Sequence, residues 1–314
     1  MRADIVLSID FELRWGVQDK LGDDFAAYRR NLEGVADVVP GTLEVFEKCG
    51  ARATWAIVGA VACEGWDEWA DRAPPSPLYL DTKLRWRDEY RKGDPRGRLY
   101  FAPRLVELVR AADGQELGSH TFSHVYMGEP GLVRRDAEAD TASVVALFRQ
   151  KWNAAPTSFV FPRNQVGFVD VLKHHGFDTW RENPEAFYWS LTSSAQNASV
   201  VRLLRLADGL LPMGTRSFRR DAPVHRASHF VRFGLSGLAW KAHMRRLVDE
   251  ARALRPGEVL HLWWHPHNLG ADVSASLARL TTLLDALRTN APSYVRFANM
   301  NDVTRLGGSS PAVH

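Results

Sequence analysis

Short apolar runs alternate with longer amphipathic segments along most of this chain, and that alternation constrains its fold more than any other feature. Runs without a helical period are expected to be buried strands, and they cover 5–9, 53–58, 116–120, 157–161, 177–180, 259–264 and 294–297. Helices are expected over 104–112, 132–151, 169–175, 240–254 and 274–287, and over the second half of 35–48, entered at Pro40-Gly41. Strands that alternate with helices form parallel sheets with crossover helices. About seven or eight such units predict an α/β fold, an irregular (β/α)7–8 barrel of the TIM type.

The composition is ordinary for a globular protein, with 45% hydrophobic and 25% charged residues. A formal charge of +3 does not by itself indicate a nucleic-acid partner. No apolar stretch approaches the ~20 residues of a membrane span, and no signal peptide is visible at the start. Cys49 and Cys63 lack metal-ligand spacing and are expected to be free thiols. We therefore expect a cytoplasmic protein, with its oligomeric state, including a homo-oligomer, left open.

Residues 1–314 show no repeat and no linker, so a single domain with one long insertion is expected. The insertion covers about 65–100 and is too long for a plain connection. Its aromatic residues include Trp66, Trp69, Tyr79 and Trp86. Such residues favour an ordered, functional segment near the substrate over a disordered loop. A basic region covers 201–250, where the arginines either meet substrate phosphates or form a solvated surface.

The stretch 116–128, ELGSHTFSHVYMG, contains two histidines four positions apart, His120 and His124. In a helical turn, positions i and i+4 share one face. Two imidazoles on that face can bind one divalent metal ion through nitrogen atoms at about 2.0–2.1 Å. Taken alone, this short pattern is more often an idle pair of histidines. A metal site therefore needs ligands from other parts of the chain.

Polar residues follow three further predicted strands, namely Asp10 with Glu12, then Arg163, then His265 with His267. Each alone has a simpler explanation, such as a solvated acid, a surface salt bridge or a capping histidine. In a barrel of this type, however, the carboxyl ends of the strands meet at one end and carry the active site. Two histidines and one carboxylate form a catalytic metal set that leaves positions open for water and substrate.

Taken in order, these segments resemble the polysaccharide deacetylase family, carbohydrate esterase family 4. SIDFE stands where that family has Thr-Phe-Asp-Asp, ATWAIVG resembles its Ala-Thr-Phe-Phe strand, and ELGSHTFSH is very close to its Gly-(Ser/Asn)-His-(Ser/Thr)-x-x-His motif. FVFPRN resembles its arginine motif and HLWWHPHN its last histidine motif. The separation of Asp10 from Glu12 by Phe11 resembles acid-x-acid branches such as bacterial surface-polysaccharide and O-antigen biosynthesis deacetylases. Arg181 and Glu182 stand where the family has an Asp-rich fourth motif.

The resemblance implies a divalent metal ion, with zinc expected and cobalt, nickel or manganese as alternatives. Glu12, His120 and His124 would be its ligands and Asp10 the general base, with the two acids interchangeable at this stage. Arg163 would hold Asp10 in place and keep it ionised, because a nearby positive charge lowers the pKa of a carboxyl group.

The last motif supplies the general acid, either His265 or His267. Strand alternation places His261 and His265 on one face, and His265 precedes a proline as in the acid-x-acid branches, so His265 is preferred. His261 is expected to be a buried strand histidine. Further residues expected near the metal or the substrate are Thr121, Phe11, Arg14, His267 and Trp264.

The function implied is hydrolysis of the acetamide of an N-acetyl sugar, in a surface polysaccharide or its nucleotide- or lipid-linked precursor, with release of acetate. A hydrolase of another C–N bond, such as a cyclic amide or formamide, is the first alternative. A carbohydrate-binding protein on a decayed deacetylase scaffold is the second. Metal content separates the binding protein from the two hydrolases, and a substrate panel separates the hydrolases from each other.

Overall fold

The computed structural model describes residues 2–18, 23–86, 88–184, 186–189, 191–196, 199–211, 217–220 and 223–307. Its strands are β1 (Ala3–Phe11), β2 (Ala53–Ile57), β3 (Gln115–Ser119), β4 (Ser158–Val160), β5 (Thr179–Glu182), β6 (Phe218–Arg219), β7 (Val224–Arg226), β8 (His229–Phe230), β9 (Glu258–Trp264) and β10 (Val295–Ala298). They form one sheet in the order β6-β9-β1-β2-β3-β4-β5-β7, with β10 paired to β1 and β8 to β9.

The sheet curls into a nearly closed barrel, because β7 pairs with β5 while β8, which follows it directly, pairs with β9. Every pair of strands in the described part of the chain is parallel except β6 with β9. The carboxyl ends of the strands therefore lie at one end of the barrel. This arrangement confirms the predicted α/β barrel of parallel strands.

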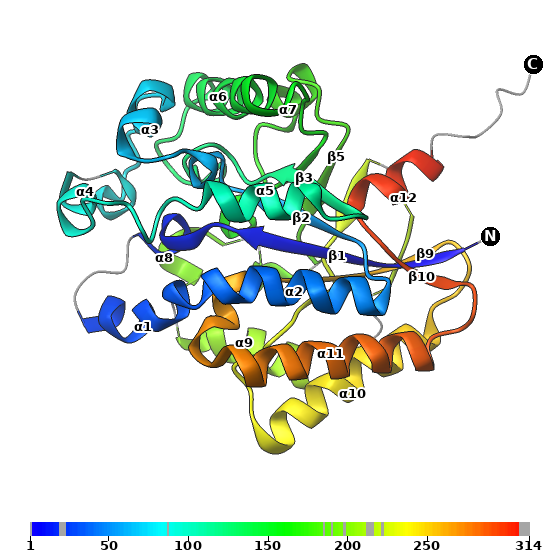
Figure 1. The fold of residues 1–314 in the computed structure, drawn as a ribbon. Helices are drawn as coiled ribbons and strands as arrows, with labels where there is room; N and C mark the ends of the chain where they lie inside the picture. The colour runs from blue at the N-terminus through cyan, green and yellow to red at the C-terminus, as the bar shows by residue number, and fades with distance from the viewer. Residues whose placement is uncertain are drawn as a thin grey trace, which may run out of the picture.

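Helices surround the sheet (Figure 1). They are α1 (Asp23–Glu33), α2 (Val35–Cys49), α3 (Trp66–Arg72), α4 (Asp88–Gly93), α5 (Pro103–Ala111), α6 (Arg134–Trp152), α7 (Val169–His174), α8 (Ser193–Gln196), α9 (Ser199–Leu210), α10 (Gly237–Ala253), α11 (Val273–Asn290) and α12 (Met300–Gly307). Across the described ranges, no helix is both long and apolar enough to cross a membrane.

Strand β1 lies at the centre of the sheet and is buried along its whole length. Because side chains alternate along a strand, Leu7, Ile9 and Phe11 face the helices and belong to the main hydrophobic core. Ser8 and Asp10 face the barrel interior. A smaller apolar cluster closes the interior below them, formed by Val6, Ala56, Val160, Val259, Ala298, Met300 and Val303. The barrel is therefore a packed core with its polar groups toward the carboxyl end.

Helix α2 begins earlier than the sequence predicts, because it continues through Pro40. Proline in a helix lacks an N–H donor and clashes with the preceding turn. The buried side chains of Val35, Val38 and Val39 hold this first part of the helix against the core. Burial of three valines, at about 1.5–3 kcal/mol each, outweighs the local cost of one proline. The prediction was wrong here because packing overrides local preference.

The segment 65–100 also differs from the prediction of little regular structure, because it contains α3, α4 and a short 3₁₀ turn at Thr82–Leu84. Figure 1 shows α3 and α4 beside the end of the barrel toward which the β1 arrow points. Trp66, Trp69 and Trp86 pack against Trp15, with ring centroids 6.2, 5.6 and 5.5 Å from it. This aromatic cluster orders a segment that lacks sequence periodicity.

Replacement of Pro40 tests how much this proline lowers the free energy of unfolding by interrupting the hydrogen bonds of α2. Pro40→Ala restores an N–H donor, and we expect the free energy of unfolding to rise by about 1–2 kcal/mol, less than the full ~3 kcal/mol because alanine makes the unfolded chain more flexible. Gly41→Ala is the matched control at the neighbouring position, because it adds no hydrogen-bond donor. Its helix-propensity gain of about 0.5–1 kcal/mol is offset by the shift of the Leu277 methyl group that lies 2.4 Å from the new Cβ, so it should change stability less than Pro40→Ala. Urea unfolding of both variants measures this. A loss of stability in Pro40→Ala would contradict the explanation.

Candidate active site

Asp10 lies inside the barrel and forms a two-pronged ion pair with Arg181 of β5. The guanidinium nitrogens Nη1 and Nη2 donate to Oδ1 and Oδ2 at 2.8 and 2.7 Å, and Nη1 also donates to Ser8 Oγ at 2.8 Å. The guanidinium carbon lies 4.4 Å from the centre of the Trp263 ring. Burial raises the pKa of Asp10, but Arg181 lowers it below the usual value. Asp10 is thereby held ionised in one orientation.

The sequence assigned this role to Arg163, and the structure corrects that assignment. Arg163 lies in the 3₁₀ turn Pro162–Asn164 with a φ of 52°, and its guanidinium carbon lies 4.9 Å from the centre of the Tyr126 ring. The error follows from the strand boundary, because the predicted strand ended at residue 180 whereas β5 runs to Glu182. Strand alternation then turns Arg181 into the barrel. An arginine inside a strand next to an apolar run was the signal that could have identified it.

Glu12 lies just after β1 and accepts contacts from two buried histidines through one carboxylate oxygen. Oε2 lies 3.2 Å from Nε2 of His120 and 2.9 Å from Nε2 of His124. Nδ1 of His120 lies 2.8 Å from the carbonyl oxygen of Val160. A carbonyl oxygen only accepts hydrogen bonds, so Nδ1 carries the proton of a neutral ring. Nε2 of His120 then presents its lone pair to Glu12.

These three side chains fit a divalent metal ion. Their ligand atoms lie within 4.8 Å of one another, and all three residues are buried. A lone pair that faces a carboxylate is unfavourable unless positive charge lies between them, and a metal ion supplies that charge. Two imidazole nitrogens and one carboxylate oxygen are the ligand set of many catalytic zinc sites. Burial raises the pKa of Glu12, but His265 and His124 lower it well below the usual value, so Glu12 is held as an anion that can bind a cation.

The loop that carries the two histidines is not the helical turn that their spacing suggested. Residues 120–126 contain a bend at 122–123 and neither helix nor strand, and Thr121 and His124 have φ angles of 64° and 58°. Residues other than glycine rarely adopt this left-handed backbone conformation. Thr121 Oγ1 accepts the N–H of Val125 at 2.8 Å, which supports the loop around His124. The convergence of the histidines therefore comes from a strained loop.

Asp140 of α6 supports the same loop, and no sequence pattern predicted this role. Its carboxylate is fully buried and accepts the backbone N–H groups of Phe122 and Ser123 at 2.7 and 3.0 Å. Burial raises the pKa of Asp140 to about 6, although these two hydrogen bonds lower it. Only a spatial contact between α6 and the loop after β3 reveals this residue.

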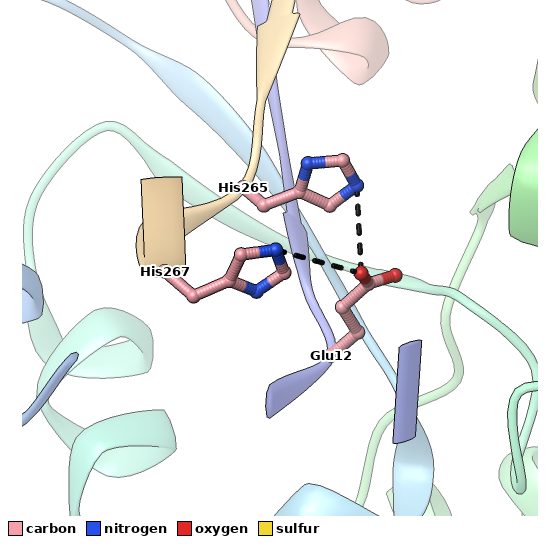
Figure 2. Close-up of side chains that lie close together, drawn as sticks. All are labelled: Glu12, His265 and His267. Atoms are coloured by element: carbon pink, nitrogen blue, oxygen red, sulfur yellow. Dashed lines mark ion pairs between the residues drawn. The ribbon is translucent and has the colours of Figure 1, made fainter. Parts of the chain in front are cut away.

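His265 and His267 follow β9 and approach Glu12 from another side. Figure 2 shows both rings directed at the Glu12 carboxylate, with Nε2 atoms 3.5 and 3.9 Å from Oε1. Nε2 of His265 also lies 3.8 Å from Oδ2 of Asp10. The two rings are stacked, with centroids 4.8 Å apart and planes 14° from parallel. His261, on the same face of β9, is fully buried with Nε2 2.8 Å from Ser8 Oγ, which confirms it as a strand histidine.

Three other predicted residues do not reach this cluster. Phe11 and Trp264 lie on the outer faces of β1 and β9 in the main hydrophobic core, because strand alternation turns them away from Asp10 and His265. The guanidinium of Arg14 stacks over the Phe25 ring, with its carbon 3.8 Å from the ring centre. The structure shows packing contacts at these positions, and their assignment as substrate-binding or supporting residues stays a prediction.

A cavity of about 370 Å³ lies beside His124, and residues of the 65–100 segment form most of its wall. The lining includes Trp69, Pro77, Tyr79 and Trp86 from that segment, together with Trp15 and His124. The wall is predominantly apolar and aromatic. The insertion therefore builds a pocket next to a candidate metal ligand.

Part of the basic region makes internal contacts, whereas Arg202, Arg219, Arg226, Lys241 and Arg245 are exposed. Residues 212–216, which include Arg216, and 221–222 lie outside the described ranges. Arg205 donates to the carbonyl oxygen of Tyr188 at 2.9 and 2.7 Å. Burial lowers the pKa of Arg205 to about 10, with Arg232 adding to this effect. Arg246 pairs with Glu250 at 3.2 Å. These contacts favour a structural role for these arginines over phosphate binding.

Comparison with known proteins identifies the fold. No family model and no curated protein matches the sequence. Among solved structures, a protein of Mycobacterium smegmatis described as a polysaccharide deacetylase has a TM-score of 0.60 at 13% identity, covering 100% of this chain and 93% of that one. A protein of Pseudomonas aeruginosa with the same description gives 0.59 at 12%, with 100% and 93% covered. The Puue allantoinase gives 0.60 at 10%, with 100% and 92% covered. The chain shares their fold.

Loss of Arg181 should leave Asp10 as an unpaired buried charge. We expect Arg181→Met to lower the free energy of unfolding by about 3–5 kcal/mol near neutral pH. Because the pair keeps the pKa of Asp10 low in the folded protein, this stabilisation is present above the unfolded pKa and disappears as the pH falls below about 4. Urea unfolding of Arg181→Met, Asp10→Asn and the double variant measures the coupling. Additive effects would show that the pair contributes nothing.

Asp140 should impose a pH dependence of opposite sign. Its pKa of about 6 in the folded state lies above the unfolded value, so the folded protein binds the extra proton between about pH 4 and 6. Stability should therefore fall by about 3 kcal/mol as the pH rises through that window. In Asp140→Asn this contribution is absent, so the stability difference between the native protein and the variant should shrink from pH 4 to 6 in urea unfolding. A difference that stays constant with pH would contradict the raised pKa.

Proposed function

We propose that this chain is a metal-dependent hydrolase that removes the acetyl group from an N-acetylated sugar. The observation that carries the proposal is the cluster of Glu12, His120 and His124 with Asp10 and His265 beside it, at the carboxyl end of a parallel barrel. Active sites of such barrels lie at that end. The cluster combines a metal ligand set, an ionised carboxylate and an imidazole within a few ångströms.

A divalent cation held by Glu12, His120 and His124, with zinc as the first candidate, would polarise the amide carbonyl as a Lewis acid and make water a better nucleophile near neutral pH. Asp10 is the general base, because Arg181 keeps it ionised and fixes both of its oxygens. It accepts the proton of the attacking water as the water oxygen bonds to the carbonyl carbon.

His265 is the general acid. Its Nε2 lies between the two carboxylates, 3.8 Å from Asp10 Oδ2 and 3.5 Å from Glu12 Oε1, where it can hold the proton that the leaving group needs. As the C–N bond breaks, His265 donates this proton to the nitrogen that leaves. The products are acetic acid, which ionises to acetate, and a free amino group on the sugar. Asp10 then loses the proton it accepted and His265 regains one, so atoms and charges balance over the cycle. The side chain is one-fifth exposed, which gives it access to a substrate.

The substrate we propose is a surface polysaccharide or its nucleotide- or lipid-linked precursor. The aromatic pocket beside His124 supports a substrate with an apolar face, since apolar pockets with a few polar groups are typical binding sites. The common fold with proteins described as polysaccharide deacetylases is consistent with this choice. The common fold with an allantoinase supports hydrolysis of a cyclic amide as the second candidate.

Metal analysis combined with a substrate panel tests the proposal. The purified protein should contain about one zinc or similar divalent ion per chain and release acetate from nucleotide- or lipid-linked N-acetyl sugars. Mutation of a residue that hydrogen-bonds to a metal ligand typically costs about 10- to 100-fold in metal affinity or activity. Loss of a ligand itself should cost more, so His120→Ala should reduce both metal affinity and acetate release by about 100-fold or more. His174→Ala, on the exposed surface of α7, is the matched control and should change neither.

The panel also separates the alternatives. Hydrolysis of allantoin or another cyclic amide, without acetate release, would replace the deacetylase with the second candidate. Absence of bound metal after incubation with zinc, cobalt, nickel or manganese would refute both hydrolases and favour the carbohydrate-binding protein.

A further inference from the structure

The two oxygens of the Glu12 carboxylate face two different pairs of histidines. Oε2 lies 3.2 and 2.9 Å from Nε2 of His120 and His124. Oε1 lies 3.5 and 3.9 Å from Nε2 of His265 and His267 (Figure 2). The proposed reaction needs a metal ion only at the first pair. His265 and His267, together with Oε1, form a second set of two imidazoles and one carboxylate oxygen.

The hydrogen bonds of Asn268 determine which nitrogen of His265 carries a proton. Asn268 Oδ1 accepts the backbone N–H of His265 at 3.1 Å, so this atom is the amide oxygen. The same oxygen lies 3.1 Å from Nδ1 of His265, and Nδ1 must therefore be a donor. In the neutral ring Nε2 then holds a lone pair, and that lone pair faces the carboxylates of Glu12 and Asp10. A proton or a cation is therefore required at this point, as it is beside His120.

The groups around this point form a cation site. Oε1 of Glu12 and the Nε2 atoms of His265 and His267 lie within 4.8 Å of one another. The two rings are stacked, and Figure 2 shows the Nε2 atoms of both directed at the Glu12 carboxylate. Asp10 Oδ2, 3.8 Å from His265 Nε2, adds an oxygen at the same point. Glu12 and His267 are buried, whereas His265 is partly exposed and leaves a route from solvent.

We propose that a second divalent cation binds Glu12 Oε1, His265 and His267, so that Glu12 bridges two cations. Bridged pairs in enzymes are about 3.5–4 Å apart, a separation that one carboxylate can span. The second site is the weaker one, since it shares the charge of Glu12 and its ligand atoms lie further apart. Because this cation occupies the nitrogen that carries the proton to the leaving group, excess metal inhibits. The inhibition rests on the proposed function, whereas the binding does not.

Manganese titration of the full, metal-free chain tests the binding without any substrate. Two Mn²⁺ ions per chain are expected in equilibrium dialysis. When both sites are filled, electron paramagnetic resonance should change from the six-line signal of isolated Mn²⁺ to the multiline signal of an exchange-coupled pair. His267→Phe keeps a ring against Tyr28, which lies 5.4 Å away, and should weaken the second ion by about tenfold or more. It should leave the first ion with its six-line signal, which also shows that the variant folds. His174→Phe is the surface control and should bind both ions.

Saturation at one ion per chain would overturn the second site. So would a second ion that gives no coupled signal and is unaffected by His267→Phe, since that ion would be bound elsewhere on the surface. Activity is a separate arm, in which excess zinc should inhibit the native protein and inhibit His267→Phe only at about tenfold higher concentration. Coupled binding without any hydrolysis would refute the proposed function and leave the two-cation site standing.

Discussion

A carboxylate buried among four histidines is stable only when positive charge lies beside it, and this condition at Glu12 governs the whole site. The rings approach both oxygens of Glu12 at 2.9–3.9 Å. His120 and His265 are each oriented by a hydrogen bond at Nδ1 that turns Nε2 toward the carboxylate. Without a proton or a cation, the cluster would consist of lone pairs directed at an anion. Its geometry is therefore that of a centre built to hold positive charge.

The barrel determines which side chains can take part in that centre. Parallel strands bring their carboxyl ends to one end, and strand alternation decides between the interior and the helical layer. Asp10 and Arg181 face inward from β1 and β5 and neutralise each other at 2.7–2.8 Å. Their neighbours Phe11 and Trp180 face outward into the hydrophobic core. A buried pair of this kind is costly to break and adds little net stability, which indicates a role in positioning rather than in folding.

The sequence predicted the parts of this structure that depend on local pattern. Apolar runs predicted seven of the ten described strands and missed the short β6, β7 and β8. Polar residues near the strand ends predicted the cluster of Asp10, Glu12, His120, His124 and His265. The sequence-based prediction failed where a contact between residues distant in the chain determines the local structure. Arg181 was missed because a strand boundary two residues too early left it in a loop, and Asp140 was missed because its partners are backbone N–H groups eighteen and seventeen positions away. The order of the 65–100 segment likewise depends on Trp15, which lies outside it.

The loop after β3 shows why the barrel tolerates many substitutions whereas the geometry of the candidate site does not. Many apolar sequences satisfy the pattern of the barrel, so proteins only 10–13% identical share it. The loop instead holds Thr121 and His124 in a left-handed conformation, which costs roughly 1–2 kcal/mol per residue. Asp140 offsets that strain through two hydrogen bonds from a helix behind the loop. Substitution of a strand residue by another apolar residue is therefore tolerated, whereas loss of the buried carboxylate of Asp140, which holds the loop between His120 and His124, would release these histidines from their positions.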